Sequence, residues 1–265
     1  MVKRLALPTR GLGAEPGIPE VTVLASWIAE RRGRPADILT YLLDQSLEPQ
    51  LTAGIMAPCA GGRFYKNRIL QCLIGIDGRE ATGEIGLDPR EISEDAAGIA
   101  GQKKGAWCAL PAPHVLGIAD AFYHDTYEWN DAITGAYRSL MRSMRDQGIN
   151  GHVLICDALS EPEITSLARQ NVLFFQPKPD RESLACLLEH QQQIAVGRDQ
   201  LNIVLDLLNE YDLRKIIIVD PDRESIARAL SCLDPDEISA GGYCRRDTCE
   251  GYWKHLVGAA VYSLR

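Results

Sequence analysis

Residues 216–225, IIIVDPDRES, decide the fold class of this chain. Ile216 to Val219 is a run of β-branched residues without a polar position, as in a strand that is buried on both faces. Asp222 and the acid that follows it after one residue suit the N-cap and first turn of a helix. The stretch therefore predicts a strand that leads directly into a helix, which is the repeating unit of a parallel α/β sheet.

The same alternation continues on both sides of this stretch. Apolar strands are predicted at 152–157, 172–176 and 238–243, and helices are predicted after Ser160 and Asp180, over 201–208 and over 253–264. We therefore predict an α/β fold with a mostly parallel sheet flanked by helices, Rossmann-like, in residues 151–265. The letters of residues 176–184 recur at 221–226, and we interpret them as one type of βα turn used twice.

Residues 1–150 are less regular, and we expect an α+β part that contains a hairpin. The hairpin is predicted within 69–87, with its turn at Asp77-Gly78. Helices are predicted at 38–47, from Pro89 onward and over 129–144, and a strand at 107–110. The expected organisation is a tail over 1–20, an α+β part over 21–150 and the α/β part over 151–265, with one continuous domain as the alternative.

Composition and charge argue against some classes of function. The chain carries 28 Lys and Arg against 36 Asp and Glu, a formal net charge of -8. Nucleic acid is therefore an unsuitable main partner, because phosphate binding needs a basic surface. No apolar run approaches the roughly 18 uncharged residues of a membrane helix, and the first residues lack the core of a signal peptide. We expect a cytoplasmic protein that does not associate with membranes.

The chain has eight cysteines, but none of them forms a C-x-x-C pair. This excludes zinc ribbons and thioredoxin motifs, and a chain of this length does not need a disulfide framework. We expect Cys72, Cys186 and Cys232 to be packing residues. The other five follow predicted strands and are expected near one edge of the sheet: Cys59, Cys108, Cys156, Cys244 and Cys249.

A basic loop without acids follows the apolar residues 54–56. Gly61 and Gly62 would let backbone N–H groups approach an anion, and Arg63 and Lys66 would supply cations for a phosphate or carboxylate. The spacing matches neither a P-loop nor a dinucleotide-binding fingerprint. The alternative is a solvated entry to the hairpin, in which the two glycines form a turn.

Asp220 and Asp222 follow the apolar run of residues 216–219. Over about six residues they resemble the magnesium-binding D-x-D string of Toprim domains. That resemblance implies carboxylates that hold Mg²⁺ for phosphoryl transfer, with Asp157 as a further carboxylate after an earlier strand. However, Ser225 stands where the family has a glycine, and Asp157 where it has a glutamate. The alternative is that the string caps a helix, and no family is assigned.

Asp120, His124 and Glu128 are spaced four residues apart, so a continuous helix would place them on one face. The carboxylates would then tune His124 as a general base or complete a metal site. A helix that begins near Asp125 would break this spacing. Both interpretations remain open at this point.

Cys244, Arg245 and Cys249 follow the last predicted strand. A cation beside a thiol lowers the thiol pKa, which favours a thiolate as nucleophile or metal ligand. Together with Cys59 and Cys156 from other strand ends, this would suit a soft divalent metal or an Fe–S cluster. The alternative is a set of incidental thiols in a tight turn.

Ligands of parallel α/β sheets bind at the carboxyl ends of the strands. The candidate residues that follow strands are therefore expected to contribute to one site. We expect an enzyme for a small phosphorylated or carboxylated substrate, with an unresolved reaction and cofactor. The candidate catalytic residues are Asp157, Asp220, Cys244 and His124. The candidate anion-binding residues are Gly61, Gly62, Arg63, Lys66 and Arg245. The alternatives are a thiol-based metal or redox protein and a non-catalytic assembly or ligand-sensing subunit.

Overall fold

The computed structural model describes residues 3–31, 36–246 and 249–264. Two four-stranded parallel sheets lie at its centre, with strand orders β10-β11-β12-β2 and β3-β6-β8-β9. Their strands are β2 (Thr9–Ala14), β3 (Cys59–Gly61), β6 (Trp107–Pro111), β8 (Gly151–Ile155), β9 (Val172–Phe175), β10 (Gln193–Gly197), β11 (Lys215–Val219) and β12 (Ile238–Cys244).

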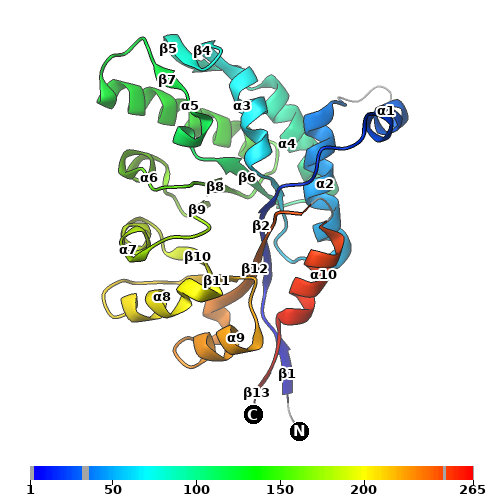
Figure 1. Ribbon diagram of the computed structural model, residues 1–265, viewed down its shortest axis with the longest axis vertical. Coiled ribbons are helices and arrows are strands. Elements are labelled where there is room, and N and C mark those ends of the chain that lie inside the picture. The colour runs from blue at the N-terminus through cyan, green and yellow to red at the C-terminus, as the bar shows by residue number, and fades with distance from the viewer. Residues whose placement is uncertain (1–2, 32–35, 247–248, 265) are drawn as a thin grey trace.

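The two sheets close into one barrel. β2 lies against the segment that leads into β3, where the Gly11 amide donates to the Ala57 carbonyl at 2.9 Å and the Ala57 amide to the Thr9 carbonyl at 3.0 Å. At the other seam β9 lies beside β10. There the side-chain amide of Gln191 accepts from the Phe174 amide at 2.9 Å and donates to its carbonyl at 3.2 Å. Figure 1 shows the resulting ring of strands with helices outside it.

A helix follows each barrel strand, so the architecture is that of a (β/α)₈ barrel. These helices are α2 (Ile38–Ala53), α4 (Arg90–Gln102), α5 (Thr126–Asp146), α6 (Glu161–Leu167), α7 (Arg181–His190), α8 (Leu201–Leu207), α9 (Arg223–Leu230) and α10 (Glu250–Ala259). The additional elements are β1 (Lys3–Ala6), α1 (Val21–Glu30), α3 (Lys66–Cys72), β4 (Leu73–Asp77), β5 (Glu80–Leu87), β7 (Ala119–Asp120) and β13 (Val261–Leu264).

The predicted fold class, an α/β protein with mostly parallel sheets flanked by helices, is confirmed. The arrangement of the sheet differs from the open, Rossmann-like sheet expected in residues 151–265. Thr9–Ala14, expected within a tail, is a barrel strand that pairs with β12, and β6 pairs with β8 across residue 150. Because the first and last barrel strands bond to each other, the parallel sheet runs through both halves and closes.

The barrel explains the continuous apolar runs of its strands. Successive side chains of a strand point to opposite faces, and in a barrel both faces are buried. One set of side chains fills the interior: Leu12, Cys59, Trp107, Ala109, Val153, Ile155, Leu173, Phe175, Ala195, Ile217 and Tyr243. The alternate set, which includes Ile216 and Ile218, joins the larger core that contains the helices.

The repeated βα turn has one structural purpose. Asp180 caps α7 by accepting from the Ser183 amide, and Asp222 caps α9 by accepting from the Ser225 amide, both at 2.8 Å. Asp222 of the Asp220-Pro221-Asp222 string is therefore the N-cap residue of α9, as the alternative interpretation of the string predicted. Ser160, in contrast, is the N-cap residue of α6 but makes no side-chain capping bond.

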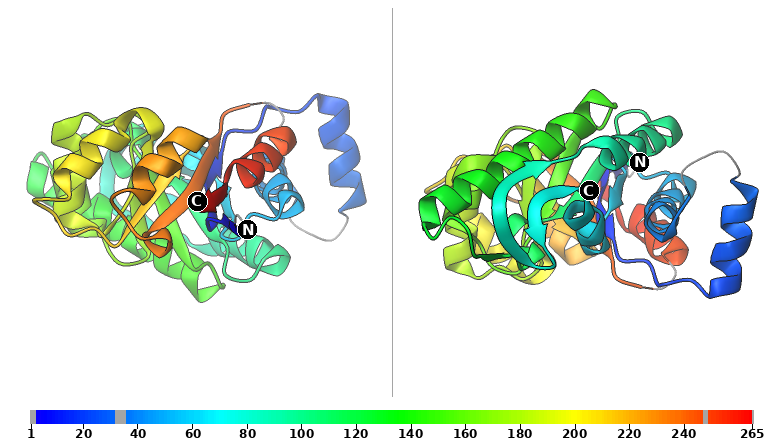
Figure 2. Two further views of the ribbon diagram at one scale, coloured as in Figure 1. Left: turned by 90° about the horizontal axis from the view of Figure 1, so that it is seen from below. Right: turned by 90° about the horizontal axis from the view of Figure 1, so that it is seen from above.

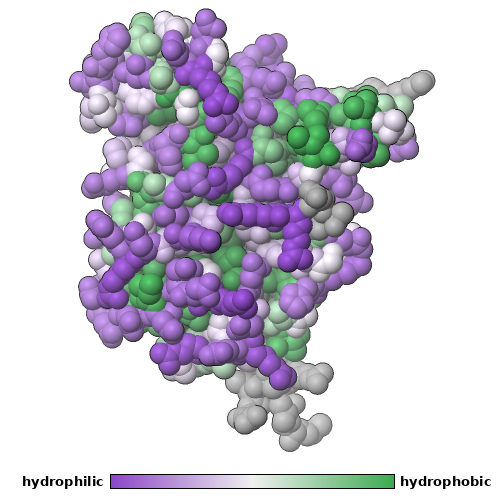
Figure 3. All heavy atoms as spheres, in the orientation of Figure 1, coloured by the Kyte–Doolittle hydropathy of each residue, from purple (hydrophilic) through white to green (hydrophobic). Residues whose placement is uncertain are grey.

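Helix α1 stands apart from the barrel, as both views of Figure 2 show. It has no buried residue, and Val21 is 82% exposed. Trp27 packs edge-on against Tyr41 of α2, which is how α1 contacts the rest of the chain. Apolar side chains gather over α1 and the adjacent end of α2 in Figure 3. Among the described helices, none combines the length and apolar character needed to cross a membrane.

His152, on β8, is fully buried, and neither ring nitrogen has a hydrogen-bond partner among the described residues. Burial, with a contribution from the charge of Arg145, lowers the pKa of His152 from 6.5 to about 3. In the unfolded chain the ring takes up a proton at its ordinary pKa. The contribution of His152 to the unfolding free energy is therefore constant above pH 6.5 and decreases as the pH falls from there toward 3.

We expect His152→Leu to remove this acid sensitivity. Each pH unit below 6.5 costs the wild type about 1.4 kcal/mol of unfolding free energy through His152. The advantage of the variant over the wild type should therefore grow by about 2 kcal/mol between pH 7 and pH 5. Urea denaturation at both pH values measures this, with the exposed His124→Asn as control. Equal acid sensitivity of His152→Leu and wild type would contradict the prediction.

Candidate functional site

The carboxyl ends of the parallel barrel strands meet at one mouth, which is where (β/α)₈ barrels carry their sites. A polar side chain follows each strand shortly after its end: Glu15 (β2), Arg63 (β3), His114 (β6), Asp157 (β8), Lys178 (β9), Arg198 (β10), Asp220 (β11) and Arg245 (β12). Of the sequence-predicted residues, the structure thus brings Arg63, Asp157, Asp220 and Arg245 to one end of the barrel.

Arg63 and Asp157 form a bidentate pair across the mouth. Nη1 and Nη2 of Arg63 donate to the two Asp157 oxygens at 2.8 and 2.6 Å. The Arg63 amide donates to Glu15 Oε1 at 2.7 Å, and the Tyr243 hydroxyl donates to the same oxygen. The Arg63 guanidinium, helped by the charges of His114 and Arg245, lowers the pKa of Asp157. Arg63 is therefore already neutralised by this chain.

Gly61 and Gly62 serve the packing of the barrel. Gly61 has φ +84°, and its amide donates to Ser46 Oγ at 2.8 Å, so this N–H is not free for an anion. A Cβ on Gly62 would lie 2.1 Å from the Ala14 carbonyl oxygen. Glycine at these positions lets β3 approach its neighbours closely.

The other cations of the basic loop hold neighbouring segments. Lys66 Nζ donates to the Val115 carbonyl at 3.0 Å. Arg68 is buried and bonds to Asp37, Glu91 and Asp95 at 2.7 to 2.8 Å. These contacts join α3 to the starts of α2 and α4 and to the segment before β7, which gives both cations a structural role.

A cavity of about 580 Å³ lies among the ends of β9 to β12; we call it the mouth cavity. Lys178, Arg245 and Arg246 line it and form no ion pair with any carboxylate in the described ranges. Arg198 also lines it and donates to Asp222 at 3.1 Å. Its aromatic lining residues are Phe175, Tyr243 and Tyr252. The cavity thus combines unneutralised cations with aromatic surface.

Asp220 is held at the rim of the mouth cavity in a strained conformation. Its φ is +51°, which a residue with a side chain rarely adopts and which clusters at functional sites. The Tyr252 hydroxyl donates to Asp220 Oδ1 at 2.5 Å and accepts from the Tyr243 amide at 2.8 Å. Burial and the nearby Asp220 charge raise the pKa of Tyr252, so its hydroxyl stays protonated. Tyr252 thereby fixes the orientation of Asp220.

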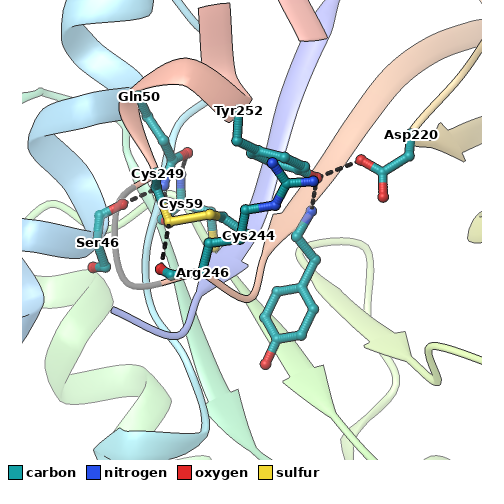
Figure 4. The surroundings of a disulfide bond; sticks show 9 residues. Ser46, Gln50, Cys59, Asp220, Cys244, Arg246, Cys249 and Tyr252 are labelled. Atoms are coloured by element: carbon teal, nitrogen blue, oxygen red, sulfur yellow. Dashed lines mark hydrogen bonds between the residues drawn. A yellow bond between two sulfur atoms is a disulfide. The ribbon is translucent and has the colours of Figure 1, made fainter. Parts of the chain in front are cut away.

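Cys244 and Cys249 form a disulfide at the same rim (Figure 4). The bond joins the last residue of β12 to the N-cap of α10, on either side of Arg245 and Arg246; residues 247–248 of this motif lie outside the described residues. Cys59 lies among the residues around the bond. The sequence predicted that Cys244 and Cys249 lie close together, but it predicted free thiols where the structure has a disulfide.

The four cysteines of the predicted metal set do not share one state. Cys244 and Cys249 are oxidised, while Cys59 and Cys156 are buried free thiols. Burial raises the pKa of Cys156 to about 12 and that of Cys59 further, which disfavours thiolates. Within the described ranges, no group of three or more His, Cys, Asp or Glu side chains is arranged to hold a metal ion.

His124 lies in an exposed turn before α5, not on a helix with Asp120 and Glu128. Asp120 accepts the His124 amide at 2.8 Å, and Asp125 caps the helix by accepting from the Glu128 amide at 2.9 Å. Asp120, His124 and Glu128 therefore do not share one helix face, because the helix begins after Asp125, as the alternative interpretation predicted.

Sequence reasoning missed four polar residues of the mouth: Glu15, His114, Tyr243 and Tyr252. His114 bonds to Glu163 through its amide and through Nδ1, both at 2.8 Å. Glu15 follows a strand that the sequence pattern does not reveal, and Tyr252 comes from a helix. Only the order of strands around the barrel could have pointed to them.

Comparison with known proteins shows the fold. No family model matches the sequence, and no curated protein matches it. A candidate vitamin-B12-independent methionine synthase from Listeria monocytogenes is similar in structure, with a TM-score of 0.64 and 12% identity over 92% of this chain and 95% of that one. A B12-independent methionine synthase from Shewanella sp. W3-18-1, solved in complex with selenomethionine, has a TM-score of 0.53 and 15% identity over 97% of both chains.

The disulfide should contribute measurably to stability. In the chain-entropy model, opening a ring of this size costs about 2 kcal/mol of unfolding free energy. We expect a reductant to lower the wild-type value by this amount, and Cys244→Ser/Cys249→Ser to have the lower value with or without reductant. Urea denaturation checks this, with Cys232→Ser as a control that keeps the reductant effect. A reductant effect that persists in the double variant would contradict the assignment.

Proposed function

We propose that this protein is an enzyme that binds a small carboxylated substrate in the mouth cavity. The observation that carries the proposal is the group of cations Lys178, Arg245 and Arg246, which line the cavity without ion-pair partners in the described ranges. A volume of about 580 Å³ suits a small molecule. Arginine recognises a carboxylate with two parallel hydrogen bonds.

The charges of the cavity favour a carboxylate over a phosphate. Asp199, Asp220 and Asp222 also line it, and they would repel the two charges of a phosphate monoester. A molecule with one carboxylate and a second group that donates hydrogen bonds would use both signs of charge. Phe175 and Tyr243 would contact its apolar part.

Asp220 is the residue best placed for acid–base chemistry. Tyr252 occupies Oδ1, which leaves Oδ2 to accept a proton from the substrate. Asp157 is less suited, because its pairing with Arg63 keeps it ionised and directed at that guanidinium. In this proposal Asp157 positions Arg63, and Cys244 does not act as a nucleophile while its sulfur is bonded to Cys249.

The structural neighbours support this proposal at the level of fold. They are described as methionine synthases, and the Shewanella protein was solved with selenomethionine, a molecule with one carboxylate. At 12% and 15% identity neither neighbour assigns a substrate to this chain. They are consistent with a barrel whose ligand is a small carboxylated molecule.

We expect Arg245→Gln to weaken substrate binding at least tenfold, because a hydrogen bond to a charged group contributes about 1.5–3 kcal/mol. Isothermal titration of a panel of amino and hydroxy acids and of phosphorylated metabolites measures this. Arg90→Gln is the matched control, since Arg90 is exposed and pairs with Asp88 away from the cavity. A panel without binding, or equal binding by Arg245→Gln and wild type, would refute the proposal.

The disulfide supports a second candidate, a thiol-based redox or metal-binding protein. In a reducing cytoplasm, the location we propose, Cys244 and Cys249 would become neighbouring thiols at the end of β12 and the start of α10. Anaerobic purification followed by metal analysis and visible absorption tests for a bound metal or Fe–S cluster. A metal-free, colourless protein would contradict the hypothesis of a bound metal or Fe–S cluster.

A further inference from the structure

A second cavity lies at the opposite, amino-terminal end of the barrel, and we call it the amino-terminal cavity. Its volume is about 540 Å³. Its lining includes the first residues of three strands, Trp107 of β6, Val172 of β9 and Gln193 of β10. None of these residues lines the mouth cavity.

Arg10 of β2 places a guanidinium next to this cavity. The guanidinium carbon lies 3.9 Å from the centroid of the Trp107 ring, and Nη1 donates to Gln193 Oε1 at 3.1 Å. Trp107 and Gln193 both line the amino-terminal cavity. Arg10 thus spans the barrel interior, from the first strand to the two residues that border the cavity.

The charge of Arg10 is not compensated by the described part of the chain. Only 9% of the residue is exposed, and among the described residues Nε and Nη2 have no hydrogen-bond partner. No described carboxylate forms an ion pair with it, and burial lowers the pKa of Arg10 to about 10. A buried charge is costly unless it is paired. Nε and Nη2 form one edge of the guanidinium, the edge that binds both oxygens of a carboxylate.

Two further arginines border the same cavity. Arg169 and Arg214 line it, together with His190 and the carboxylates Glu189 and Asp212. None of these side chains forms an ion pair within the described ranges, although Arg169 Nη1 donates to the Ala168 carbonyl at 2.5 Å. With Arg10, the arginines outnumber the carboxylates in a protein whose formal net charge is -8.

We propose that the amino-terminal cavity is a second binding site, for a small oxyanion that carries a carboxylate or phosphate group. When the Gln193 side chain turns aside, the anion takes its place as acceptor at Arg10 Nη1, the nitrogen that Gln193 now covers on the cavity side. Arg214 and Arg169 contact its outer oxygens. Gln191, which bridges β9 and β10, also lines this cavity, so the bound anion stabilises the barrel at this seam.

Thermal unfolding with added sodium phosphate or citrate, at constant ionic strength with sodium chloride, tests this site. At ten times the dissociation constant we expect the wild-type Tm to rise by about 4 °C, and to rise further with the logarithm of the anion concentration. Arg10→Met should fold, because replacing an uncompensated buried charge by an apolar side chain is often neutral or stabilising. It should show no such shift with either anion. Arg245→Gln, at the mouth cavity, should keep the shift.

The two anions also separate the chemical classes: a shift with phosphate alone assigns a phosphate, and one with citrate alone assigns a carboxylate. Gln193→Ala gives an independent readout, because it removes the competing acceptor and should tighten binding severalfold. It decides the question even if Arg10→Met does not fold. An unresponsive wild type, equal shifts in wild type and Arg10→Met, or unchanged affinity in Gln193→Ala would overturn the proposal.

Discussion

The pairing of β2 with β12 is the constraint on which the rest of the structure depends. In this pair Gly241 lies opposite Arg10 and Gly242 opposite Gly11. A Cβ on Gly241 would lie 2.3 Å from Ile217 Cγ2, and one on Gly11 would lie 2.0 Å from Gln50 Oε1. Glycine at these positions lets β12 pack closely against Ile217 of β11, and β2 against Gln50 of α2. The closed ring then directs the strand ends of both halves of the chain to one mouth.

The sequence predicted those strands whose two faces are both apolar. Residues 216–218 and 153–155 are buried on both sides, so their composition alone indicates a parallel strand. The sequence pattern did not predict β2, because four of its six residues are Thr9, two glycines and a buried arginine rather than large apolar residues. The closing hydrogen bonds join opposite ends of the chain, and no local pattern distinguishes a closed barrel from an open sheet. The open, Rossmann-like arrangement was expected for this reason.

The candidate site was predictable in position but not in pairing. Parallel strands place Asp157, Asp220 and Arg245 at one end, and that follows from the sequence alone. Which cations are already neutralised depends on contacts between distant elements: Arg63 is paired with Asp157, while Arg245 has no carboxylate partner in the described ranges. Lys66 and His124 belong to insertions between barrel elements, where spacing says nothing about the distance to the mouth. The pairing of Cys244 with Cys249 likewise depends on where α10 begins.

The overall charge of -8 is a poor guide to the ends of this barrel. Arg10 lies at the amino-terminal end of β2 and Glu15 just beyond its carboxyl end, with Leu12 and the other interior side chains between them. This apolar interior surrounds the buried guanidinium of Arg10, and in a medium of low polarizability an unpaired cation acts more strongly on an approaching anion. Both proposed anion sites lie at the ends of the barrel, where the fold concentrates arginine, so the acidic net charge of the chain does not argue against them.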